Sequence, residues 1–310
     1  MPAYLARRLL VAIPTILVII TVAFFMMRVA PGGPFDLERP LPEEIRQNVL
    51  AAYGMDQPIW KQYVDYMAGL ARGDLGPSLK FRDKDVAQII SEGLPVSATI
   101  GLLSISLALV LGSIFGAIAA LRQNTSTDYG VVAFATVGIV IPPFVVGPIL
   151  ALFIGIYLGW LPSGGLDPRH GMTVERLILP VITLALPQIA IISRLMRASM
   201  IEVIRSNYIR TARAKGLSAP AVIFRHALRS AILPLVSYLG PASAALLTGS
   251  IVIEQVFSLP GIGRQFVFAA LQRDYTVVMG VVILYASLII LLNLVADLLY
   301  AALNPKVSYD

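Results

Sequence analysis

The 310-residue sequence contains no cysteine and only two histidines, so two side chains that often bind metals or act in catalysis are absent or scarce. Disulfides, thiolate metal sites and cysteine catalysis are therefore excluded. Charged residues are also scarce, at 14% of the chain, whereas hydrophobic residues make up 57%. A soluble domain carries roughly 25% charged residues. The composition therefore predicts an all-α polytopic membrane protein.

Several motifs of catalytic and binding sites are missing too. The chain has no G-x-x-x-x-G-K-[ST] loop to hold ATP phosphates, and neither G-x-S-x-G nor H-E-x-x-H occurs. His170 and His226 fall on opposite faces of the membrane in the topology that the charges indicate, so they cannot share a metal. We expect no catalytic residue, metal or cofactor on this chain. The net charge of +6 comes from basic residues that are distributed according to the side of the membrane, so no nucleic-acid partner is expected.

Six apolar stretches without charge approach or exceed the roughly 20 residues that a helix needs to cross a bilayer. The third carries Pro142, Pro143 and Pro148, so it should be kinked or broken. The last should continue to Leu303, which places Asp297 near its inner end. The stretches are Leu9–Met27, Val96–Leu121, Tyr129–Trp160, Leu177–Ser193, Ser230–Ile253 and Tyr275–Ala296.

Basic residues are divided unequally between the segments that join these stretches. With a cytoplasmic N-terminus, the inner segments hold twelve lysines and arginines and the short outer loops hold four. The positive-inside rule then places both termini in the cytoplasm. The first stretch resembles a signal peptide, but its length and the lack of a cleavage site predict a retained helix. The inner residues are Arg7, Arg8, Arg122, Arg194, Arg197, Arg205, Arg210, Arg213, Lys215, Arg225, Arg229 and Lys306, and the outer ones are Arg169, Arg176, Arg264 and Arg273.

The segment 31–93 should form a small helical extracytoplasmic insertion. We expect it to pack as a cap over the helix ends; the alternative is a docking surface for an external protein that carries substrate. Three short helices are expected, from Pro42 to Gly54, from a cap at Asp56 to Gly73, and from a cap at Asp83 over Val86–Glu92 to Gly93.

The most basic segment, 194–229, should lie outside the bilayer because of its charges. Gly216 stands where a glycine would end a helix, directly after Lys215, whose charge suits a helix C-terminus. Ser218 and Pro220 can begin a second short helix. The residues therefore predict helix, glycine turn, helix. A basic loop that only sets topology or binds anionic lipid is the alternative.

This segment resembles the cytoplasmic signature loop of ABC importer permeases, in which E-A-A, three residues, Gly and nine residues precede I-x-L-P. Gly216 and Ala212 fit this pattern, whereas Arg210 and Thr211 replace its first two positions and only Leu228 fits downstream. The version R-T-A-R-A-K-G-L is similar to that of the peptide-importing branch. The resemblance implies that a helix around 212–222 docks on an ATPase subunit. The implied coupling residues are Arg210, Thr211, Ala212, Arg213, Ala214, Lys215, Gly216 and Leu217.

Further matches extend the resemblance along the whole chain, closest to the B-type permease of oligopeptide importers. Dipeptide and nickel importer permeases are near relatives that these motifs barely separate. The matches are A-P-G-G-P-F at 30–35, D-Q-P-I at 56–59, G-D-L-G at 73–76, L-P-S-G-G at 161–165, T-G-S at 248–250, Glu254, L-P-G-I-G at 259–263, R-D-Y at 273–275 and N-P-K at 304–306.

The resemblance implies a type I ABC importer permease in the bacterial cytoplasmic (inner) membrane. Its partners would be a second homologous permease, two ATPase subunits that carry ATP and Mg, an extracytoplasmic peptide-binding protein and short peptides. The alternatives are nickel or another small solute, a membrane scaffold, or a secondary transporter, which would need paired broken helices. The expected divisions are 1–30 for the first helix, 31–93 for the outer loop domain, 94–303 for a five-helix core with the coupling loop 194–229, and 304–310 for a cytoplasmic tail.

Polar residues within the apolar stretches are candidates for the translocation path. The first candidate is Glu254 at the outer end of the fifth stretch, because ionisable groups at membrane depth are functional candidates. Ser250 and Thr248 precede it in the same stretch and are candidates with it. Asp297 and Gln188 are further candidates on the same ground. The alternatives are paired or solvated acids at the interface and, for the small residues of the fifth stretch, close helix packing.

Overall fold

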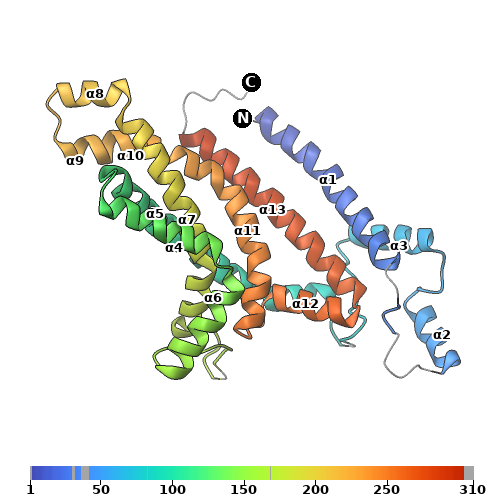
Figure 1. Cartoon of the computed structure of the whole chain (residues 1–310). Helices are drawn as coiled ribbons and strands as arrows, with labels where there is room; N and C mark the ends of the chain where they lie inside the picture. Colours follow the sequence, from blue (N-terminus) through green and yellow to red (C-terminus); the bar gives the residue numbers. More distant parts are fainter. Residues whose placement is uncertain (1, 30–31, 36–41, 82, 168, 304–310) are drawn as a thin grey trace.

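A computed structural model describes residues 2–29, 32–35, 42–81, 83–167 and 169–303, without the side chains of 2–7, 9, 248 and 249. Among these residues, five helices are long and apolar enough to cross a membrane, and the number is six when one bent pair is counted as a single span. All six predicted apolar stretches are helical, and the last helix reaches Leu303 as expected (Figure 1). They are α1 (Pro2–Val29), α4 (Val86–Leu121), the bent pair of α5 (Ser126–Val140) with α6 (Pro143–Leu150) and the π-helix η1 (Ala151–Tyr157), α7 (Val174–Ile204), α11 (Leu233–Val256) and α13 (Tyr275–Leu303).

The bent pair confirms the predicted break in the third stretch. Its two halves meet at 99°. Ile141 is extended, with ψ 115°, because the proline that follows disfavours a helical residue before it. Pro142 and Pro143 then begin α6, where a missing N–H costs no hydrogen bond.

Among the described helices, α4 and α7 share the most extensive packing. A stripe of small residues recurs every four positions on α4 and is buried against α7, which lets the two backbones approach closely. A Cβ at Gly112 would lie 2.8 Å from the Cβ of Ile192, and one at Gly116 would lie 2.4 Å from the Ser193 carbonyl oxygen. The stripe is Ser104, Ala108, Gly112, Gly116 and Ala120.

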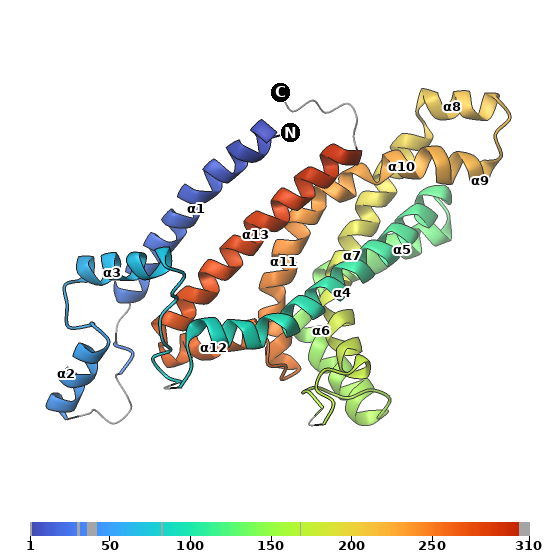
Figure 2. The same ribbon diagram turned by 180° about the vertical axis from the view of Figure 1, so that it is seen from behind.

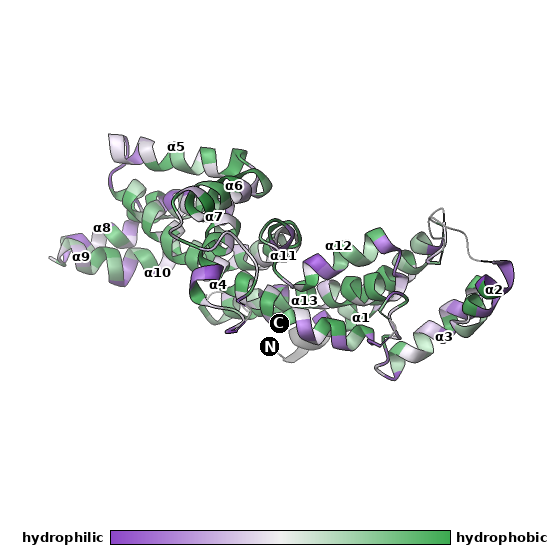
Figure 3. Ribbon diagram, turned by 90° about the horizontal axis from the view of Figure 1, so that it is seen from below, coloured by the Kyte–Doolittle hydropathy of each residue, from purple (hydrophilic) through white to green (hydrophobic). Residues whose placement is uncertain are grey.

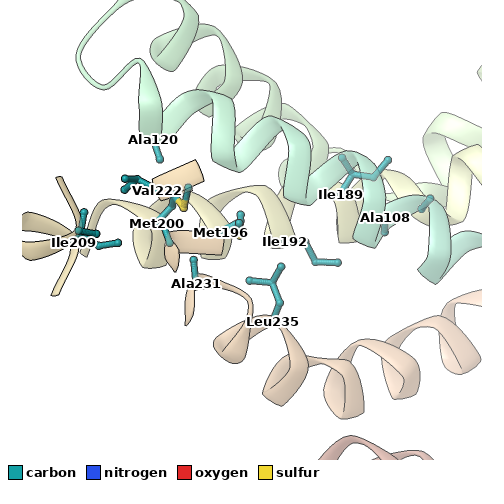
Figure 4. Close-up of a cluster of buried hydrophobic side chains, with 13 residues drawn as sticks. Ala108, Ala120, Ile189, Ile192, Met196, Met200, Ile209, Val222, Ala231 and Leu235 are labelled. Carbon is teal, nitrogen blue, oxygen red and sulfur yellow. The ribbon is translucent and has the colours of Figure 1, made fainter. Parts of the chain in front are cut away.

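The end of α7 continues into four short helical segments, three of which contribute side chains to one hydrophobic cluster (Figure 4). Met196 and Met200 of α7, Ile209 of α8 and Val222 of η2 meet there, together with Leu235 of α11. The segments are α8 (Asn207–Ala214), α9 (Ala219–Ala221), the π-helix η2 (Val222–Ala227) and α10 (Leu228–Ala231).

The outer insertion packs on α1 and α13 through aromatic side chains. Phe24 of α1 is fully buried and meets Tyr63 edge-on with ring centroids 5.3 Å apart. Burial raises the pKa of Tyr66 in the same cluster to about 12, so its hydroxyl stays protonated. The two helices are α2 (Glu43–Ala52) and α3 (Ile59–Ala71), which confirms the first two predicted helices.

Three details of that prediction are wrong. Pro58, not Asp56, stands at the N-cap of α3, and Asp85, not Asp83, stands at the N-cap of α4. The third short helix does not end at Gly93, because α4 runs without a break from Val86 to Leu121. Gly93 allows close contact instead: a Cβ there would lie 3.0 Å from the backbone nitrogen of Ile262.

Polar residues gather at the two ends of the bundle. The first turn of α1 and the last turn of α13 lie at the end that carries α8, whereas α6 and α12 (Ile262–Gln272) lie at the opposite end (Figure 1). Arg8 pairs with Asp297 at 2.6 Å, which fastens α1 to α13 near their α8 end. Hydrophobic residues cover the long helices, while hydrophilic residues gather on α8 and α2 (Figure 3). The polar ends bracket an apolar belt.

Candidate functional site

The basic segment forms a helix, a glycine turn and a second helix, which confirms the prediction from its residues. Gly216 adopts φ +81°, a conformation that strains any residue with a Cβ. Its N–H donates to the Arg213 carbonyl at 2.9 Å, and the Leu217 N–H donates to the Ala212 carbonyl at 3.3 Å. These two bonds make a Schellman cap. A continuous helix around 212–222 is therefore wrong, because Gly216 separates α8 from α9, whose N-cap is Ser218.

α8 is two-sided. Ile209 and Ala212 are buried in the chain's own hydrophobic cluster, and Leu217 is half-buried against it. Ala212 is thus small because it packs on this chain. The other predicted coupling residues form the exposed face of α8 and its turn. They are Arg210, Thr211, Arg213, Ala214, Lys215 and Gly216.

Two aromatic residues of the same segment are also exposed, and sequence reasoning missed them. Tyr208 at the start of α8 is 46% exposed, and Phe224 in η2 is 72% exposed. Exposed aromatics beside arginines are typical of the energetic centres of protein interfaces. The sequence signal would have been an aromatic residue in a basic segment that lies outside the apolar stretches.

An ion pair fixes α7 where it leaves the apolar belt. The Nε and Nη2 of Arg197 donate to the two carboxylate oxygens of Asp128 at 2.5 and 2.7 Å. Asp128 is almost fully buried and also accepts the backbone N–H of Asn124 at 2.9 Å. A bidentate pair of this kind is geometrically specific. Arg197, predicted only as part of the basic segment, is therefore neutralised by α5.

At the opposite end, Glu254 joins three helices. The carboxylate of this fully buried α11 residue accepts the Ser97 hydroxyl of α4 at 2.6 Å and the Arg264 N–H of α12 at 3.1 Å. The Ser97 oxygen in turn accepts the Ile262 N–H at 2.8 Å. Glu254 and Ser97 thus satisfy the free amides of the first turn of α12 from two other helices. Seen from behind, α12 crosses the ends of α4, α11 and α13 (Figure 2).

A small cavity lies beside this contact, between α4, α11 and α13. Its volume is about 200 Å³, and residues without a polar side chain, mainly leucines, form most of its wall. The hydroxyl-bearing residues Ser97, Ser243, Ser250 and Tyr285 also line it. The structure therefore brings Ser250 and Glu254, two predicted path residues, to one region. The side chain of the third, Thr248, lies outside what the structure describes.

Asp274 performs a similar task for the outer loop. Its buried carboxylate accepts the Ser78 hydroxyl at 2.5 Å, the Leu79 N–H at 3.2 Å and the Thr276 hydroxyl at 3.0 Å. The loop before α4 is thereby fixed to the first turn of α13. Sequence reasoning noted Asp274 only within R-D-Y, since its partners are almost 200 positions away.

Comparison with known proteins places this arrangement in a family. Residues 112–309 match the model of the binding-protein-dependent transport system inner membrane component, and residues 1–100 match the model of the N-terminal part of such membrane components. The chain is 50% identical over 306 residues to the oligopeptide transport system permease protein OppB of Salmonella typhimurium and 48% to that of Haemophilus influenzae, covering 99% of both chains in each case. It is 40% identical to the dipeptide transport system permease protein DppB of Bacillus subtilis, over 99% of this chain and 98% of the relative.

A solved structure shares the fold. The structure of inward-facing conformations of the MetNI methionine ABC transporter matches with a TM-score of 0.59 at 18% identity, over 70% of this chain and 96% of that one. The predicted type I importer permease fold is confirmed by this match and by the family model together. The chain belongs to the family of binding-protein-dependent transport system inner membrane components.

Proposed function

We propose that this chain is a permease subunit of an ATP-driven importer of short peptides. The observation that carries the proposal is the 48–50% identity to oligopeptide permeases over 99% of both chains. A permease for nickel or another small solute is the second candidate, because no residue described above selects a peptide. Uptake of labelled di-, tri- and pentapeptides, competed with nickel, separates the two.

The proposed assembly contains a second homologous permease, two ATPase subunits that bind ATP and Mg, and an extracytoplasmic peptide-binding protein. This chain then sits in a bacterial cytoplasmic (inner) membrane with both termini and 194–229 in the cytoplasm. The segment 31–93 faces outward and receives the binding protein. The core 94–303 forms the path, preceded by 1–30 and followed by the tail 304–310. α4 crosses the boundary at 93, so the loop and the core are continuous.

Coupling is proposed to pass through the exposed face of α8 and its turn. Arg210, Arg213 and Lys215 are exposed there with Thr211, Ala214 and Gly216. Ala212 and Leu217 support that face from the inside by packing on the hydrophobic cluster. Motion of an ATPase against this face would move α7, because the cluster joins α8 to Met196 and Met200. A ligand biases such a bundle only if it binds its two states with different affinity.

Glu254, Ser250 and Thr248 are proposed to belong to the outer part of the path. Glu254 is fully buried between α4, α11 and α12 in this conformation. We infer that it acts by holding α12 across the bundle and is uncovered when α12 moves. A path that opens at this end must break the hydrogen bonds from Ser97 and Arg264.

Gly216→Val tests the coupling proposal. The backbone strain costs about 1 kcal/mol or more, and no heavy atom lies within 4 Å of the added Cβ, so the effect should stay in the turn. We expect normal membrane insertion and nucleotide binding, but reduced peptide uptake and reduced substrate-stimulated hydrolysis in liposomes.

Gly73→Val is the matched control. Gly73 has φ +80°, the same Schellman bonds at the end of α3 and equally open surroundings, but it lies in the outer insertion. It should leave hydrolysis coupled to uptake. Equal loss in both variants would assign the effect to strain alone, and a Gly216→Val complex like wild type in both assays would exclude this turn as the transmission element.

A further inference from the structure

A groove between α5 and α7 has a polar end and an apolar end. Its volume is about 530 Å³. Arg194 and Arg197 line it near the α8 end of the bundle, and Val132, Ile139, Ile191 and Leu195 line it with hydrocarbon. Neither the coupling face nor the contact around Glu254 uses this groove.

The two arginines differ in charge compensation. Arg197 is neutralised by its bidentate pair with Asp128, which is buried and therefore unable to serve a second cation. Arg194 lies one helical turn earlier on α7 and is exposed. Within the described part of the chain it has no acidic partner at ion-pair distance. An exposed arginine at the end of an apolar span is suited to bind an anionic lipid headgroup.

Arg194 directly follows the fourth predicted apolar stretch, which ends at Ser193. It lies ten residues, or about 15 Å, before the end of α7 at Ile204, and about 4.5 Å deeper than Arg197. Asp128 sits in the first turn of α5, where the chain re-enters the apolar belt. The arginine therefore stands near the boundary between the belt and the basic end of the molecule, where a long cationic side chain reaches the headgroup layer.

The apolar part of the groove runs toward the middle of the membrane. Val132 is one turn beyond Asp128, and Ile139 is seven residues, or about 10 Å, further along α5. A phospholipid has an anionic phosphate at the membrane boundary and hydrocarbon chains below it, so its two parts match the arginine end and the apolar end of the groove. Arg205 and Arg122, both exposed near the same end, add positive charge that favours an anionic headgroup.

We propose that the groove between α5 and α7 binds one anionic phospholipid, with its phosphate on Arg194 and an acyl chain along Val132 and Ile139. Such a lipid would bridge the start of α5 and the half of α7 that leads to α8. It would supply the counter-charge that Arg194 lacks. The assignment is independent of the transported substrate.

The test uses the full chain, purified with the subunits that accompany it, and an equimolar mixture of dioleoyl-phosphatidylglycerol and dioleoyl-phosphatidylcholine. Native mass spectrometry counts the bound lipids. One arginine near a headgroup contributes about 1 kcal/mol, or roughly fivefold in binding. Arg194→Gln should lower the ratio of bound phosphatidylglycerol to bound phosphatidylcholine by about that factor. Arg264→Gln, which removes an exposed arginine from α12 at the opposite end of the bundle, should change the ratio less than twofold.

A second measurement identifies the occupant. A benzophenone amino acid at Ile139 should crosslink to an acyl chain in the membrane, and Ile139→Trp should displace that lipid while Arg194 remains. Equal lipid ratios in Arg194→Gln and wild type would overturn the proposal. Crosslinks from position 139 to another permease chain or to peptide would overturn it too, because the groove would then be a subunit interface or part of the path.

Discussion

Replacing Gly116 by alanine should separate α4 from α7 and destabilise the protein. A Cβ at Gly116 would lie 2.4 Å from the Ser193 carbonyl oxygen and 2.6 Å from the Cβ of Met196. Ordinary contact begins near 3.4 Å, so the two helices must part by about 1 Å, and a backbone carbonyl cannot turn aside as a flexible side chain would. Overpacking of this kind costs about 1–3 kcal/mol.

The same helix provides a matched control in Gly101. No heavy atom lies within 4 Å of a Cβ added there. Replacing glycine by alanine within a helix gains up to about 1 kcal/mol, and this gain is common to both positions. The difference between Gly116→Ala and Gly101→Ala therefore isolates the packing cost, about 1–3 kcal/mol, or roughly 5- to 150-fold in the folded-to-unfolded ratio.

Both variants are purified in one detergent, and unfolding is followed by steric trapping and by the fraction that stays monodisperse after heating. Gly101→Ala should match or exceed wild type, and Gly116→Ala should fall below it. If the two variants have the same free energy of unfolding and the same heat resistance, Gly116 is not needed for close contact between α4 and α7, and the packing argument fails.

Two further outcomes follow from the structure. Asp274→Ala removes the acceptor of Ser78, Leu79 and Thr276, so the amide hydrogens of the loop before α4 should exchange faster. Asp274→Asn should give a smaller change, and unchanged exchange in the alanine variant would contradict the anchoring role. In intact cells an impermeant maleimide should label Lys61→Cys and spare Lys215→Cys, both exposed positions, and the reverse pattern would invert the proposed orientation.

Local features of the fold could be predicted because the residues that determine them are neighbours in the chain. Apolar length is enough to find the spans, Pro142 and Pro143 are enough to break the third, and Gly216 after Lys215 marks a helix end. Each depends on backbone geometry within one turn. Gly93 misled the prediction because a glycine for close packing and a glycine for a helix end look alike in sequence.

Contacts between distant residues could not be predicted in the same way. Glu254 and Ser97 are 157 positions apart, and Asp128 and Arg197 are 69 positions apart. Sequence identified Glu254 as unusual because a charge in an apolar stretch needs a partner, but which partner depends on how the helices pack. The same reasoning missed Asp128, because it stands at the edge of its stretch, where an acid is unremarkable.

α4 links the two ends of the molecule, and this makes a prediction about transport. Ser97 holds α12 at one end and Gly116 packs on α7 at the other, 19 residues or about 28 Å apart along the helix. At that distance the stability costs of Ser97→Ala and Gly116→Ala should add within about 0.5 kcal/mol. Their effects on substrate-stimulated hydrolysis should not add. If α4 moves as one body between the outer contact and α7, either substitution breaks the same link, so the double variant should lose little more than the worse single one. Losses that multiply would mean that the two ends act on hydrolysis independently, and α4 would then be a scaffold and not the connecting element.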